Sequence, residues 1–544
     1  MSNGSKNRTG LILLASGLGL LAFEMLFYEA QNVVYGPGIE FLLRFTDVNG
    51  PKEYVTRYLL TNSYYPPLYF AFIFLVHLLF GMRFLPHVLA NAALVAAGAV
   101  FLYLAMRRRT DEWAAGLAAA LFLLLPGPTF FTKTLAIEQP FLLLIPLTLF
   151  MLGKAEGFSK RSASICLGVV AGLGMLNKWT YAAYTIVPFA ACACACLGKS
   201  AEPREEKSSA GRGLNFALFL LAGVVVSGPW YFGVMDIRKL VATAGNDPNF
   251  PAFSFGAQLA LNARLFLELN GQFVVAFLAP ASIAAFAMSK KRLDVATGVL
   301  ALVVPLVLFS IPRHLEDRYI YPLCALIPVL AAIIAESAPK KIKIAFWCAF
   351  AALVLAGHAD SYWADYFKPG RLRDAANYHD GRLVWGRLGT SRLMDEIAGD
   401  AARRFPGRTV AISAHPLWTD VHAGNLNTRY LSAVDPKYGN IRLNEFAKFR
   451  YREFSRAILE GGLDYILLDC GLEGVCSDEP KPSVSLRPED RMTEVYIEQR
   501  YGQVHRPFTD QDVLDDLAFI RERFVKIADL RLDSANRVWI YARK

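Results

Sequence analysis

Residues 86–106 read PHVLANAALVAAGAVFLYLAM and run directly into three arginines, Arg107 to Arg109. An α-helix needs about 20 mostly apolar residues to cross the roughly 30 Å of hydrocarbon in a bilayer. The stretch has that length and contains no Asp, Glu, Lys or Arg. It therefore predicts a membrane-spanning helix whose last residue lies beside a basic loop.

Similar apolar runs recur through the first two thirds of the chain. Spans are predicted at 11–27, 86–106, 113–126, 140–153, 164–177, 181–198, 214–234, 272–288, 293–311, 319–336 and 342–358. The composition agrees, because 54% of the 544 residues are hydrophobic and only 19% are charged, against about a quarter charged in soluble proteins. We expect an α-helical polytopic membrane protein with about 11–13 transmembrane helices within residues 1–358.

The charges of the loops predict the orientation. Basic loops at 107–109, 154–161, 199–212, 289–292 and 340–343 alternate with the loops 127–139, 178–180, 235–271 and 312–318. Cytoplasmic loops carry the excess of Lys and Arg. The N-terminus is then cytoplasmic, and everything after residue 358 is extracytoplasmic, in a multi-pass protein of the plasma (inner) membrane. The net charge of +10 reflects this bias, and no nucleic acid is expected as a partner.

The segment 67–80, PLYFAFIFLVHLLF, does not fit this alternation. The loops before and after it, 28–66 and 81–85, both fall on the outer side. A short apolar segment can be re-entrant or interfacial, and this is the prediction here. The alternative is a full crossing at 67–80 together with one missed or wrongly added span elsewhere.

From about residue 360 the apolar runs shorten to strand length and charge rises. Strands are predicted at 408–413, 464–469, 525–532 and 537–543, helices at 390–404, 442–460 and 511–523, and a turn at 533–536. Helices between strands indicate a soluble α/β domain over 359–544, on the outer side. There Cys470 and Cys476 either close a small disulfide loop or remain free thiols.

The first outer loop, 28–66, is long and rich in residue types that carry chemistry. Its carboxylates include Glu29, Asp47 and Glu53, and six tyrosines accompany them, among them Tyr65. Carboxylates act as general bases, and aromatic rings stack on sugars or lie at the level of lipid headgroups. The alternative is a solvated loop with an aromatic belt.

Other outer loops bring cations to the same face of the membrane. Lys178 lies in LNKWTY, and Arg313 and Arg318 lie in PRHLEDRY. Cations here run against the positive-inside trend, so we expect them to hold an anionic lipid phosphate. The simpler alternative for the two arginines is pairing with the adjacent acids at 316 and 317.

Two further acids stand out by position. Glu138 in AIEQP begins a span, either as part of a site or as a helix N-terminal carboxylate favoured by the dipole. Glu24 lies near the end of the first span, where it either reaches the headgroups or has a function, as acids at membrane depth usually do.

The order of the motifs is more specific than any one of them. Along the chain come Glu29-Ala30, Tyr65-Pro66-Pro67-Leu68, Arg107–Arg109, Glu138-Gln139-Pro140, a Gly-rich helix ending at Lys178, Pro229-Trp230, and Arg318-Tyr319. In this order they resemble the GT-C superfamily of polyprenyl-phosphate-sugar-dependent glycosyltransferases, in particular the protein O-mannosyltransferases and the aminoarabinose transferase of lipid A. Three positions depart from the family pattern: Tyr28 stands in place of Asp, Tyr65 in place of His, and Glu138 in place of Asp.

The resemblance implies an inverting glycosyltransferase that moves a sugar from a polyprenyl phosphate to a lipid, glycan or protein acceptor on the outer face of the membrane. It implies Glu29, then Asp47 and Glu53, as the catalytic base; Lys178, Arg313 and Arg318 as ligands of the donor phosphate; and Tyr65, Glu138 and Tyr319 as substrate-binding residues. It requires no certain cofactor, although a divalent metal is compatible with it. The alternatives are a transporter or flippase for a lipid-linked substrate, which would favour repeated halves that the sequence lacks, and a non-catalytic membrane scaffold.

Overall fold

A computed structural model describes most of the chain. The described residues are 3–29, 50–60, 65–81, 84–132, 136–197, 209–236, 255–289, 292–311, 319–362, 387–414, 436–443, 459, 462–469, 510–531 and 537–544. The chain forms two compact units, the first from residues 1–26, 48–245 and 253–378 and the second from residues 27–47, 246–252 and 379–544.

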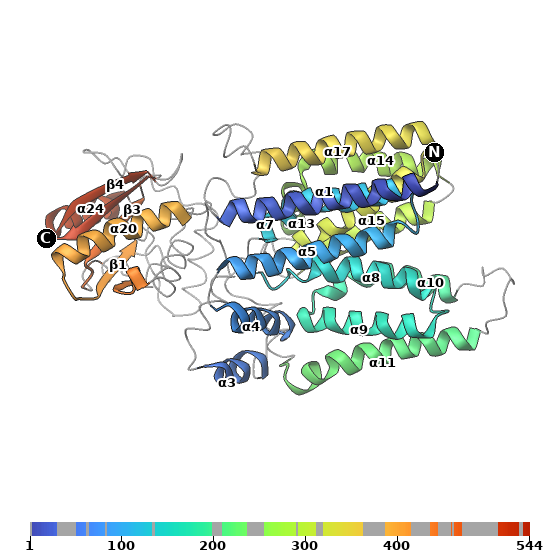
Figure 1. The fold of residues 1–544 in the computed structure, drawn as a ribbon, viewed down its shortest axis with the longest axis horizontal. Helices are drawn as coiled ribbons and strands as arrows, with labels where there is room; N and C mark the ends of the chain where they lie inside the picture. The colour runs from blue at the N-terminus through green and yellow to red at the C-terminus, as the bar shows by residue number, and fades with distance from the viewer. Residues whose placement is uncertain are drawn as a thin grey trace. The chain divides into compact units, whose positions relative to one another are not determined.

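The first unit is a bundle of helices, many of them lying side by side (Figure 1). They are α1 (Asn3–Glu29), α3 (Pro51–Tyr54), the π-helix η1 (Val55–Leu60), α4 (Leu68–Phe80), α5 (Phe84–Met106), α6 (Glu112–Leu124), α7 (Pro126–Thr132), α8 (Phe141–Ala155), α9 (Arg161–Asn177), α10 (Tyr181–Leu197), α11 (Ser209–Gly233), α13 (Phe255–Asn270), α14 (Gln272–Met288), α15 (Arg292–Phe309), the 3-10 helix η3 (Tyr321–Leu326), α16 (Ile327–Glu336) and α17 (Lys340–Tyr362). Each of the eleven apolar runs predicted to span falls on a helix.

The lengths of these helices fit a multi-pass membrane protein. Within the described residues, five are long and apolar enough to cross a membrane: Arg8–Met25, Leu85–Met106, Gly211–Gly233, Arg292–Phe309 and Lys340–Ala359. A sixth span results if α13 and α14, bent by 104°, are counted as one, and six further apolar helices are shorter. The helix α4 has 13 residues, as many as α6, which lies on a predicted span, so the re-entrant placement of 67–80 remains a prediction.

Three helices of the bundle run in the same direction. Gly10 of α1 lies against the first residue of α6, and Gly17 lies against residue 120, so α1 and α6 are parallel and in close contact. At the start of α17, the Lys343 ammonium donates to Asp111, which precedes α6, at 2.6 Å. The basic stretches at the starts of these three helices therefore share one end of the bundle.

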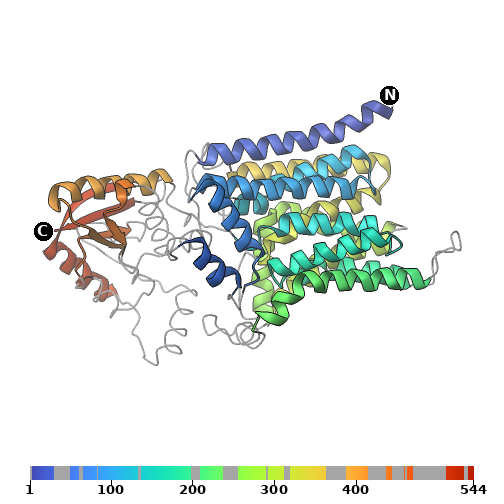
Figure 2. The same ribbon diagram turned by 60° about the horizontal axis from the view of Figure 1, so that its bottom comes forward.

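The second unit is a five-stranded sheet with helices on both faces. Its strands are β1 (Val410–Ala414), β2 (Ile441–Leu443), β3 (Tyr465–Asp469), β4 (Phe524–Arg531) and β5 (Arg537–Arg543), in the order β2-β1-β3-β5-β4. β1 is parallel to β2 and β3, whereas β5 is antiparallel to β3 and β4. Figure 2 shows α20 (Arg387–Arg404) and α24 (Asp510–Arg523) on opposite faces of the sheet.

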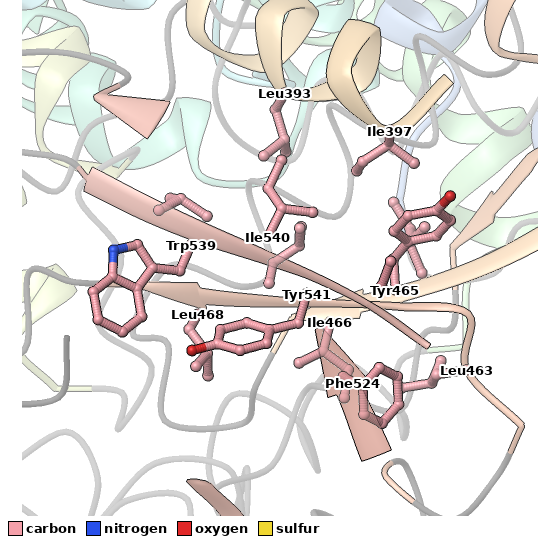
Figure 3. Close-up of a cluster of buried hydrophobic side chains, with 14 of the residues drawn as sticks. Leu393, Ile397, Leu463, Tyr465, Ile466, Leu468, Phe524, Trp539, Ile540 and Tyr541 are labelled. Atoms are coloured by element: carbon pink, nitrogen blue, oxygen red, sulfur yellow. The ribbon is translucent and has the colours of Figure 1, made fainter. Parts of the chain in front are cut away.

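Because helices cover both faces of the sheet, the five residues 538–542 of β5 are all buried. Figure 3 shows Leu393 and Ile397 of α20 near Ile540 of β5, all fully buried. The four predicted strands and the helices expected at 390–404 and 511–523 are present. The helix predicted at 442–460 is wrong at its start, because residues 442 and 443 belong to β2. A strand of three residues is too short to be recognised from its hydrophobic pattern. The rest of that prediction, except residue 459, and the turn 533–536 lie outside the described residues.

Candidate membrane-embedded site

A buried ion pair joins two segments of the bundle that are 40 residues apart. Glu138 lies in the turn before α8, and Lys178 follows the last residue of α9 with an extended backbone. The Lys178 ammonium donates to the Glu138 carboxylate, and the two side chains are 1% and 0% exposed. Beside them the Asn177 side-chain amide donates to the carbonyl oxygen of Ile137 at 2.7 Å. This second bond fixes the two segments against each other.

Two tyrosine rings flank the ammonium group. The Lys178 nitrogen lies 4.2 Å from the ring centroid of Tyr319 and 5.6 Å from that of Tyr65. Both distances are within the range of cation–π attraction. The Tyr184 hydroxyl donates to the carbonyl oxygen of Tyr319 at 2.7 Å and holds that segment in place. The structure thus brings together Tyr65, Glu138, Lys178 and Tyr319, four of the residues selected from the sequence.

The pair lies at one end of two short apolar helices. The basic turn at 154–161 connects α8 and α9, which have 15 and 17 residues, so these helices are about 22 and 25 Å long. The pair lies at their other ends, short of the roughly 30 Å that a bilayer core measures. Buried ion pairs contribute little to stability compared with apolar residues of the same volume, and ionisable groups at membrane depth usually mark function.

Two amide side chains lie next to the Glu138–Lys178 pair. The Tyr321 hydroxyl donates to the side-chain oxygen of Gln139 at 3.3 Å. Among the described residues, the other halves of two buried amides, the Gln139 nitrogen and the Asn177 oxygen, have no hydrogen-bond partner. A donor and an acceptor are therefore left unsatisfied next to the charged pair. No role was predicted from the sequence for either residue. Their positions in apolar surroundings next to Glu138 and Lys178 could have indicated that they belong to the same site.

The remaining predicted residues are not placed at this pair. Glu29 is the last residue of α1, but its side chain is not described, and Asp47, Arg313 and Arg318 lie outside the described residues. Glu53 is half-buried in α3, next to Tyr54, whose ring stacks on Phe74 at 4.9 Å. The roles of all five remain predictions.

Metal ligands do not gather in the described part of the chain, where no three His, Cys, Asp or Glu side chains come together. The pair itself contributes one carboxylate and one ammonium, and an ammonium repels a cation. Cys470 and Cys476 lie outside the described residues, so their disulfide remains a prediction.

The sequence matches a family model over residues 65–226, that of the dolichyl-phosphate-mannose-protein mannosyltransferases. Tyr65, Glu138 and Lys178 fall within the match. Among solved structures, apo ArnT from Cupriavidus metallidurans shares 14% identity over 97% of each chain with a TM-score of 0.50. The chain has the GT-C glycosyltransferase fold.

Two further solved structures align with lower scores. The archaeal oligosaccharyltransferase AglB from Archaeoglobus fulgidus, in complex with an inhibitory peptide and a dolichol-phosphate, has 10% identity over 98% of this chain and 88% of its own, with a TM-score of 0.47. The arabinofuranosyltransferase AftD from Mycobacteria has 17% identity over 98% of this chain and 41% of its own, with a TM-score of 0.43. No curated protein sequence matches the chain. The GT-C resemblance expected from the motif order is confirmed by the family model and the fold, and it supports glycosyltransferase activity.

Proposed function

We propose that this protein transfers a sugar from a polyprenyl phosphate to a lipid, glycan or protein acceptor on the extracytoplasmic face of the membrane, with inversion at the anomeric carbon. The observation that carries the proposal is the buried Lys178 ammonium, held by Glu138 and two tyrosines. The family model supports the donor class, because its description names a dolichyl-phosphate-linked sugar.

The reaction needs a fixed cation. The bond between the anomeric carbon and the phosphate oxygen breaks, and its electron pair leaves with the phosphate, where negative charge grows. The acceptor oxygen bonds to the opposite face of the same carbon, and its proton passes to a carboxylate. An ammonium group has three N–H donors, so Lys178 is able to hold Glu138 and a phosphate oxygen together. Such preorganised stabilisation is often the largest single contribution to catalysis.

The carboxylate base is proposed to come from the first loop. Glu29 is the first choice because it follows the first span directly, with Asp47 and Glu53 as the other candidates. General-base assistance contributes a factor of about 10²–10⁴. Arg313 and Arg318 are proposed as further cations for the donor phosphate. Tyr65 and Tyr319, which flank the ammonium, are proposed as substrate-binding residues.

The proposed orientation follows from the shared basic end of α1, α6 and α17. Placing that end in the cytoplasm makes the ion pair closer to the opposite surface. The catalytic loop 28–66 and the domain 359–544 then belong to the extracytoplasmic side of the plasma (inner) membrane. The C-terminal domain is proposed to help choose the acceptor.

The test begins with deletion of the gene and mass spectrometry of lipid-linked sugars and envelope glycans. We expect one sugar to be lost from one acceptor and its polyprenyl-phosphate donor to accumulate. Wild-type protein should restore the modification, whereas Lys178→Met at equal membrane abundance should not. Unchanged glycans and lipids in the deletion strain, or full restoration by Lys178→Met, would refute the proposal.

A further inference from the structure

A second buried polar pair lies in the bundle, far from Lys178 in sequence. Glu24 of α1 and His358 of α17 are almost completely buried, and the Glu24 Oε1 and His358 Nε2 atoms are 2.5 Å apart. Each residue is the last but one of its candidate span, Arg8–Met25 or Lys340–Ala359. Because both helices begin at the basic end, the pair lies at their far ends, still within the apolar stretch.

The histidine also binds the end of a third helix. Its Nδ1 atom is 3.0 Å from the carbonyl oxygen of Leu124, the last residue of α6. A carbonyl oxygen only accepts, so Nδ1 carries a hydrogen and donates it. The Leu124 carbonyl is one of the helix-end carbonyls that has no acceptor role within its own helix. His358 therefore joins the far ends of α1, α6 and α17.

The hydrogen bond from Nδ1 limits the pair to two arrangements of its protons. With a hydrogen on Nδ1, a neutral His358 presents Nε2 as an acceptor, and Glu24 must be protonated to donate to it. A charged His358 instead donates from Nε2 to a carboxylate. In both states one proton lies between Glu24 and His358, and the pair has no net charge, which suits an apolar layer.

Stability alone does not explain the pair. The second carboxylate oxygen of Glu24 is buried without a hydrogen-bond partner among the described residues, an arrangement that disfavours folding. Apolar side chains of equal volume hold helices together at least as well. The pair instead makes the packing of the helices specific, because its hydrogen bonds form only when the three helix ends meet in one arrangement.

Those helix ends lead to two acids of the proposed site. Five residues beyond Glu24, α1 ends at Glu29. Beyond Leu124 the chain passes through α7 to Glu138. We infer that Glu24 and His358 are positioning residues, a proton-sharing pair that fixes where α1 and α6 end and so places the segments that bear Glu29 and Glu138. The inference rests on the proposed function of those two acids.

Two single variants and one double variant test the inference in the full-length protein in lipid nanodiscs. His358→Phe keeps a ring but loses both hydrogen bonds, and should lower turnover about 10- to 100-fold, the effect of a small misplacement, with the donor KM unchanged. Glu24→Gln still donates to Nε2, and should keep turnover within about threefold of the parent. The double variant Glu24→Leu/His358→Phe also removes the buried acid and leaves only the Leu124 carbonyl without its donor, so it should recover part of the thermal stability but not turnover.

Hydrogen–deuterium exchange of residues 125–132 provides a readout that does not depend on activity. Exchange should rise in His358→Phe and in the double variant but not in Glu24→Gln. The control is Asn215→Ala, which removes another buried bond, from the Asn215 amide to the Phe158 carbonyl at 2.9 Å, and should leave turnover and this exchange unchanged.

Parent-like turnover in the double variant, or unchanged exchange in His358→Phe, would overturn the positioning role. Loss of turnover in Glu24→Gln equal to that in His358→Phe would also overturn it, because ionisation and not the hydrogen bond would then be required. If the parent transfers no sugar, the proposed function fails, while the exchange data still decide whether the pair fixes α6.

Discussion

Replacing Lys178 with methionine separates a structural ion pair from a catalytic cation. Methionine keeps most of the side-chain volume and removes the charge, so Glu138 is left buried without its partner. Removing one member of a buried pair costs about 3–5 kcal/mol of folding stability. The contact with the Tyr319 ring at 4.2 Å is lost as well, although Glu138 limits the damage by taking up a proton. We expect a loss of about 3 kcal/mol, at the lower end of that range.

The effect on turnover has a different origin. A fixed donor that stabilises developing negative charge contributes a factor of about 10²–10³, so Lys178→Met should lower turnover by at least about 100-fold. Glu138→Gln leaves the ammonium in place and should lose stability but retain more turnover than Lys178→Met. In the double variant Lys178→Met/Glu138→Gln no charge is buried, so stability should recover while turnover stays as low as in Lys178→Met.

The assay is release of polyprenyl phosphate from a polyprenyl-phosphate sugar by protein in nanodiscs, together with the midpoint of thermal unfolding. Lys343→Met is the matched control, because Lys343 also pairs with two carboxylates, Asp111 and Glu336, but at the basic end of the bundle. It should lower the midpoint without the large loss of turnover. If the double variant regains turnover to within about threefold of the parent, Lys178 serves only the fold and the reasoning is refuted.

Other parts of the chain give three further predictions. Glu29→Gln should lower donor consumption about 10²–10⁴-fold, with full activity in this variant excluding it as the base. Gly98→Ala should destabilise the bundle by about 1–3 kcal/mol, because a Cβ there overlaps a main-chain carbonyl of α8. Gly19→Ala is the control and should not destabilise it, because a Cβ at Gly19 meets nothing within 4 Å. Equal midpoints of thermal unfolding for the two variants would contradict this packing. The Arg537 guanidinium, through its hydrogen bonds, holds the pKa of Asp529 below the ordinary value of 3.8. The stability that this carboxylate contributes is therefore present above about pH 4 and is lost as the pH falls through the lowered pKa. The protection factors of the β4 and β5 amides, taken relative to the intrinsic exchange rate at each pH, should therefore decrease on acidification, less steeply in Asp529→Asn.

More of the site can be predicted from the sequence than its individual motifs indicate. Charges at the ends of apolar runs identified Glu138 and Lys178 separately, one as a substrate ligand and the other as a phosphate ligand. The basic turn between the two runs is centred near Phe158, and residues at equal distances before and after the turn of a helical hairpin face each other. Glu138 and Lys178 are each 20 residues from that centre. Their pairing was predictable from this symmetry, whereas the rings of Tyr65 and Tyr319 come from outside the hairpin and only the motif order suggested them.

Glu24 and His358 show a different limit. They are 334 residues apart, so no hairpin symmetry relates them, and Glu24 was recognised only as an acid at membrane depth. Yet an acid there requires a partner at the same depth. The spans predicted at 11–27 and 342–358 both begin at a basic stretch, and Glu24 and His358 both lie at or near their far ends. Matching the titratable residues of spans by depth, measured from the basic end, pairs them from the amino-acid sequence alone. The contact to Leu124 cannot be predicted in this way, because every residue has a main-chain carbonyl and the sequence does not show which one accepts the hydrogen bond. It is this contact that connects the pair to a third helix.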